Sequence, residues 1–68
     1  SLDHNERAME LLATMPKDAV TEYLRAIACS RLGRKAEGRR HFLEACRLDE
    51  RMEYRGNLDP EIAELLKQ

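Results

Sequence analysis

Apolar residues recur every three or four positions along most of the chain, which is the period of an α-helix that buries one face. In residues 3–16 the apolar positions are Ala8, Leu11, Leu12 and Met15. Asp3 or Asn5 is expected to cap this helix, since their side-chain oxygens accept free backbone N–H groups. Pro16 is expected to end it, because proline lacks an amide hydrogen and disfavours helical angles at the preceding residue.

A second, wider apolar pattern predicts a helix over residues 19–32, with Asp18 as its N-cap. Its apolar positions are Val20, Tyr23, Leu24, Ala26, Ile27, Ala28, Cys29 and Leu32. They cover more than half of the circumference, whereas a surface helix needs one stripe, so we expect neighbours on two sides. Gly33 is expected to supply the left-handed residue that ends the helix.

A third helix is predicted over residues 35–48, where the apolar positions are Ala36, Phe42, Leu43, Ala45, Cys46 and Leu48. Gly38 lies inside it and costs about 1 kcal/mol relative to Ala in helix propensity. Such a glycine is expected where another backbone approaches closely.

The remaining residues predict a loop and one short helix. Residues 49–58 are expected to be a loop with its turn at Gly56-Asn57. A cap at Asp59 and a proline next to it predict a helix over residues 59–68. Its narrow apolar face suits a helix that closes the end of a domain.

Composition supports an all-α domain. The 68 residues are enough for one small domain, with 43% hydrophobic and 37% charged residues. Only five residues are β-branched, and three glycines and two prolines leave few helix breakers.

An internal repeat appears when the chain is compared with itself at an offset of 34 residues. Ala8 then falls on Phe42, and the next four positions pair Met9, Glu10, Leu11 and Leu12 with Leu43, Glu44, Ala45 and Cys46. Helix pairs that recur at about this period are typical of solenoid proteins.

The residues resemble a tetratricopeptide repeat. The run from Tyr23 to Gly33 is similar to the first helix of such a repeat, and Gly38, Phe42, Ala45, Leu48 and Asp49 follow at the spacing of its second helix. Glu22 departs from the family pattern, which usually has a large apolar residue there, as do Gly38 and Glu50, which replace the commoner Ala and Pro. The resemblance implies antiparallel helical hairpins: residues 3–16 as the second helix of a preceding repeat, 18–50 as one full repeat and 59–68 as a capping helix.

The resemblance also implies a scaffold that binds a protein or peptide in a groove lined by first helices. By spacing, the groove side of the second helix would carry Val20, Tyr23, Ile27, Ser30 and Arg31. A partner segment would pack against Tyr23 and Ile27, and Arg31 would orient it. The competing interpretation is that Val20, Tyr23 and Ile27 belong to the core.

Two alternatives to this scaffold function do not involve a groove ligand. In one, the chain is the structural C-terminal cap of a longer helical array, and in the other it associates with a second copy of itself. The face for self-association would consist of Ala8, Leu11, Leu12 and Met15, because this helix lacks its own partner helix.

Charge is uneven, although the net charge is only −1. Residues 31–47 contain six basic and two acidic residues, and the flanking segments are acidic. Arg34, Lys35, Arg39 and Arg40 form a basic patch that suits an acidic peptide or a phosphate, or a solvated edge facing acidic side chains. A helix-turn-helix that binds nucleic acid is a minor alternative, against which the acidic surroundings argue.

No residues indicate catalysis, a metal or a cofactor. His4, Cys29, His41 and Cys46 show no ligand spacing, and a mid-helix cysteine in an apolar stripe has no reason to ionise. Both cysteines are expected to be buried thiols, which favours a reducing, cytoplasmic location. No apolar run is long enough to span a membrane, so no membrane partner is expected.

Overall fold

The computed structural model describes the backbone of residues 2–67 and the side chains of residues 3–67. This part of the chain contains no strand and five helices: α1 (Leu2–Ala13), α2 (Ala19–Arg31), α3 (Lys35–Leu48), α4 (Arg51–Asn57) and α5 (Pro60–Leu66). The predicted all-α class is confirmed, with one helix more than expected.

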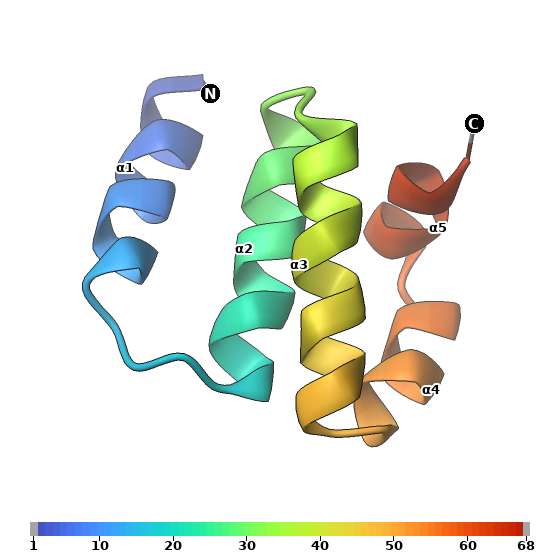
Figure 1. The fold of residues 1–68 in the computed structure, drawn as a ribbon. Coiled ribbons are helices and arrows are strands. Elements are labelled where there is room, and N and C mark those ends of the chain that lie inside the picture. The colour runs from blue at the N-terminus through green and yellow to red at the C-terminus, as the bar shows by residue number, and fades with distance from the viewer. Residues whose placement is uncertain (1, 68) are drawn as a thin grey trace.

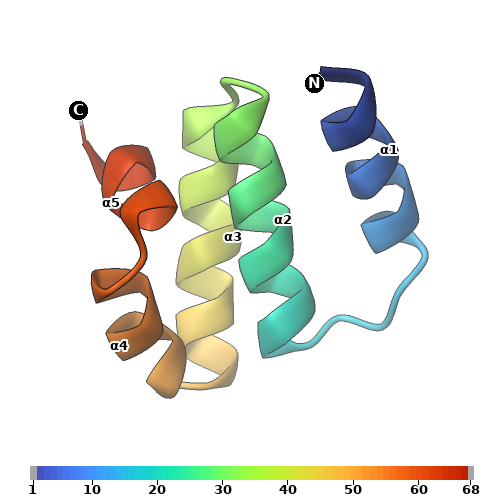
Figure 2. The ribbon, with the colours of Figure 1, turned by 180° about the vertical axis from the view of Figure 1, so that it is seen from behind.

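The helices lie side by side in a flat arrangement of about 29 × 28 × 17 Å. Antiparallel helices α2 and α3 form the central pair, and α1 lies against α2 on one side (Figure 1). On the other side α4 and α5 lie next to α3, as the view from behind also shows (Figure 2), and they pack against both α2 and α3. Helix α2 therefore has neighbours on two sides, as its wide apolar stripe predicted.

Most helix boundaries follow the predicted caps. Asp18 Oδ1 accepts a hydrogen bond of 2.7 Å from the Thr21 amide, and Gly33 has a φ of +78° after α2. Asp59 Oδ1 accepts a bond of 3.0 Å from the Glu61 amide at the start of α5. These caps confirm the predicted starts of α2 and α5 and the predicted end of α2.

The start of α1 differs from the prediction. The helix begins at Leu2, so Asp3 and Asn5 lie inside its first turns and do not cap it. Asp3 instead pairs with Arg7 one turn later, at 3.3 Å. The helix ends at Ala13, before the proline, as expected.

The predicted loop over residues 49–58 is wrong, because it contains α4. Gly56 was assigned to a turn, but it is buried inside this helix. A Cβ atom at Gly56 would lie 2.5 Å from two atoms of the Phe42 ring, so the absence of a side chain is what lets α4 pack on α3. Helix α5 ends at Leu66, and residue 68 of the predicted capping helix lies outside the described residues.

The core lies where α2, α3, α4 and α5 meet. Its buried members are Tyr23, Ala26, Phe42, Ala45, Met52, Ile62 and Leu65. Tyr23 packs edge-to-face on Phe42, with ring centroids 6.1 Å apart, and the Arg55 guanidinium lies 4.7 Å from the centre of its ring. The Tyr23 hydroxyl donates a hydrogen bond of 2.7 Å to Asp59. One side chain of α2 thus contacts α3, α4 and the N-cap of α5.

The predicted close approach at Gly38 is confirmed. A Cβ atom there would lie 3.2 Å from both the Ala26 carbonyl oxygen and Cys29 Cβ, and 2.8 Å from Leu65 Cδ1. Since Leu65 and Ala26 are fully buried, neither can withdraw easily.

Replacing this glycine tests the packing of α2 on α3. Helix propensity alone would make Gly38→Ala more stable by about 1 kcal/mol. We expect the opposite, a loss of about 1–3 kcal/mol from overpacking, measured by urea unfolding. If Gly38→Ala were instead stabilised by the helix-propensity gain, α2 and α3 would have to be farther apart than in this structure.

The Tyr23–Asp59 bond predicts a specific pH dependence. The hydrogen bond from Tyr23 lowers the pKa of the Asp59 carboxyl, and the backbone amides of Glu61 and Ile62 lower it further. The stability that the carboxylate contributes is therefore present above its unfolded pKa of about 3.9 and is lost as the pH falls through the lower folded pKa.

Tyr23→Phe should reduce the free energy of unfolding by about 1.5 kcal/mol at neutral pH, since a bond to a charged acceptor is lost. The difference from the wild type should shrink in acid, where Asp59 is protonated. Tyr54→Phe is the matched control, because Tyr54 is 71% exposed. A Tyr23→Phe deficit that stays constant with pH would rule out the charged acceptor.

Candidate binding groove

A groove runs between α1 and α2, on the side of α2 that α3 and α5 leave free. Its cavity volume is about 240 Å³, and its walls are formed by Asn5, Ala8, Leu11, Leu12, Leu24, Ile27, Ala28 and Arg31. We call it the α1–α2 groove. Apart from the amide of Asn5 and the guanidinium of Arg31, the side chains of the walls are aliphatic, so the groove suits an apolar ligand.

The floor and the rim of the groove differ in exposure. Leu12 and Ala28 are buried and close the floor, whereas Leu11 is 65% and Leu24 is 42% exposed at the rim. Met15, two residues after α1, and Val20, in the first turn of α2, are further exposed apolar side chains that do not line the groove. Leu11 and Leu24 thus form an exposed apolar strip along the groove, of the kind that marks interaction sites on soluble domains.

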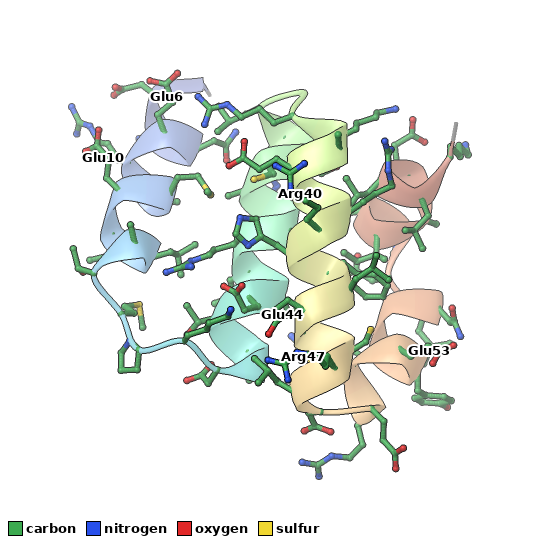
Figure 3. The ribbon with its side chains drawn as sticks, in the orientation of Figure 1. Glu6, Glu10, Arg40, Glu44, Arg47 and Glu53 are labelled. Atoms are coloured by element: carbon green, nitrogen blue, oxygen red, sulfur yellow. The ribbon has the colours of Figure 1, made fainter. Side chains whose placement is uncertain are left out.

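Polar contacts hold α1 in place beside this strip. Arg25 Nη2 donates a hydrogen bond of 2.6 Å to the Leu12 carbonyl oxygen in the last turn of α1. Its Nη1 lies 3.0 Å from Oε2 of Glu22, a carboxylate that is only 3% exposed. Figure 3 shows Glu6 and Glu10 on α1, and both are exposed, whereas Ala8, Leu11 and Leu12 of the same helix line the groove.

The predicted groove residues separate in the structure. Ile27 and Arg31 line the α1–α2 groove, but Val20 is exposed beyond it and Ser30 is half-buried without lining it. Tyr23 is 1% exposed on the opposite side of α2, so the expectation that it anchors a partner is wrong. Spacing within one helix defines a stripe, but α2 has two apolar sides and spacing does not say which one stays open.

Arg31 is already paired within the chain. Its Nε donates to Glu61 Oε2 at 3.0 Å, and this hydrogen bond raises the pKa of the guanidinium. A carboxylate of a partner would therefore compete with Glu61 for Arg31. The Arg31 guanidinium was expected to orient a ligand, but it instead helps to hold α5 against α2.

The predicted basic patch also divides. Lys35 Nζ lies 3.9 Å from Glu64, and Arg39 Nη1 donates to the Leu65 carbonyl oxygen at 3.3 Å, so both face α5. This matches the alternative of an edge that faces the acidic capping helix. Arg34 and Arg40 are exposed, and Figure 3 shows Arg40 on the same side of α3 as Glu44 and Arg47, which pair with each other.

Sequence spacing missed a group of potential metal ligands. One ligand atom each from Cys29, Glu37 and His41 lies within 4.8 Å of the others. Spacing along the chain did not reveal the group, because Cys29 comes from α2 and the other two residues from α3. Burial raises the pKa of the Cys29 thiol, so without a metal it is a neutral thiol and a poor nucleophile at neutral pH.

The described helices include none that is long and apolar enough to cross a membrane. Comparison of the chain with protein-family models, with curated proteins and with solved structures gave no match.

Proposed function

We propose that the chain is a helical-repeat module that binds an amphipathic helix of a partner protein in the α1–α2 groove. The exposed apolar strip at this groove carries the proposal. Leu11 and Leu24 stand on opposite walls, and both leave large apolar surface in water. A helix that laid its apolar face there would cover both rims, as in other helix-in-groove complexes.

The arrangement of the helices is consistent with a tetratricopeptide-type module. Moving α2 by 34 residues gives the range 53–65, which covers most of α4, the break at residues 58 and 59, and most of α5. These two short helices pack against both members of the α2–α3 pair, as the first helix of a following repeat would. By the same logic, the α1–α2 groove is the place where the first helix of a preceding repeat would lie.

Selection from a random peptide library displayed on phage tests the proposal without a known partner. We expect enriched peptides with apolar residues at intervals of three and four, which bind the wild type. Leu11→Glu should weaken their binding at least tenfold, because a charge would be placed against their apolar face. Leu43→Glu is the matched control, since Leu43 is also 65% exposed but lies on α3, away from the groove.

A library that yields no enriched peptide, or peptides that bind Leu11→Glu as well as the wild type, would contradict the proposal. Both variants should keep the helical content of the wild type, since the replaced side chains are exposed.

A second candidate, self-association, is favoured by the exposure of Leu11 in α1 and of Met15, two residues after this helix. Of the four predicted contact residues, Leu12 is buried and Ala8 is half-buried, so only Leu11 and Met15 are open for contact. Sedimentation at increasing concentration separates the candidates. A dimer that Leu11→Glu dissociates and Leu43→Glu does not would identify a second copy as the occupant.

A further inference from the structure

A cluster of sulfur, oxygen and nitrogen ligands lies between α2 and α3, apart from the aliphatic walls of the groove. Cys29 of α2 meets Glu37 and His41 of α3, with one ligand atom from each within 4.8 Å of the others. Glu37 and His41 are four residues apart, so they share one face of the helix. Met9 of α1 adds a thioether, whose sulfur is 3.9 Å from the Cys29 sulfur.

The orientation of His41 is set by a second carboxylate. Its Nδ1 lies 3.2 Å from Oε1 of Glu22, a side chain that is 3% exposed. When Nδ1 carries the proton and donates it to this bond, Nε2 keeps a free lone pair. A carboxylate behind a histidine is the usual outer-shell support of a metal-binding imidazole.

The other oxygen of Glu22 is incompletely bonded. Oε2 is buried and accepts no hydrogen bond, although the charged Arg25 lies 3.0 Å away. A buried carboxylate with spare acceptor capacity is costly unless nearby positive charge offsets it. Arg25 supplies such charge on one side, and a divalent cation bound to His41 would add more on the other oxygen's side.

From these contacts we propose that Cys29, Glu37 and His41 bind a Zn²⁺ ion. Thiolate, imidazole and carboxylate are the ligands that Zn²⁺ takes in proteins, and three of them leave a fourth position for water or another ligand. Cys29 is fully buried, but Glu37 and His41 are half-buried, so the ion can enter past them. The Cys29 thiol gives up its proton to the solvent when its sulfur binds the metal.

The charges around the cluster agree with this assignment. The Cys29 thiolate and the Glu37 carboxylate contribute two negative charges, which balance the two positive charges of the ion. The proposal is independent of the groove, because none of the three ligands lines it.

Titration of the reduced, chelator-treated chain with Zn²⁺ and with Co²⁺ tests the site. We expect saturation at one equivalent at micromolar metal, and a thiolate-to-cobalt charge-transfer band in the Co²⁺ spectrum. Cys29→Ser should abolish that band, and Glu37→Gln and His41→Gln should each weaken binding at least tenfold. Cys46→Ser is the matched control, since Cys46 is a free cysteine of α3 outside the cluster, and it should bind as the wild type does.

Glu37→Gln decides the outcome if the buried Cys29→Ser variant fails to fold, because Glu37 is half-buried and its replacement keeps the shape of the side chain. No saturation at micromolar metal, a Co²⁺ spectrum without the thiolate band, or equal binding by Glu37→Gln and the wild type would each overturn the site. Leu11→Glu should bind Zn²⁺ normally, which separates this site from the α1–α2 groove.

Discussion

The arrangement of the helices depends on the contacts of the buried Tyr23 side chain. Its ring lies against Phe42 of α3 and under Arg55 of α4, and its hydroxyl bonds to Asp59 at the cap of α5. A chain of this length buries a small core, so one side chain that contacts three neighbouring elements has a large share in its stability. The same residue directs one apolar side of α2 towards α3, α4 and α5.

The other side of α2 is left to α1, and this asymmetry produces the groove. Helix α1 is held by the hydrogen bond from Arg25 and by the packing of Leu12, but the side chain of Leu11 remains in water. Burial of apolar surface drives association, so an open strip next to a closed core is where a partner helix would gain most. Fold and proposed function thus follow from one property of α2, its two apolar sides.

The helices could be predicted from the sequence where local chemistry decides. Asp18, Gly33 and Asp59 mark boundaries because a cap or a left-handed residue acts within its own turn. The same local reasoning failed at Gly56, which resembles a turn residue but is a glycine because the ring of Phe42 occupies the space of its Cβ atom. That reason lies in a residue fourteen positions away, and no local pattern reveals it.

The candidate sites were less predictable for the same reason. Spacing correctly predicts that Ile27 and Arg31 line the groove, yet Tyr23 of the same stripe lies in the core. Leu11 and Leu24 line the groove because α1 and α2 lie side by side, and the pattern within either helix does not show this contact. Cys29, Glu37 and His41 converge from two helices, and a fixed spacing of histidine and cysteine within one segment does not reveal such a group.

Hydroxyl-radical footprinting read by mass spectrometry tests the account most directly, because it compares the two sides of α2 in one experiment. The two tyrosines are an internal pair: Tyr23 is 1% and Tyr54 is 71% exposed. The account predicts rapid modification of Tyr54 and Leu11 and strong protection of Tyr23. Modification of Tyr23 at the rate of Tyr54, with Leu11 protected, would show that α2 presents its other side and would contradict the account.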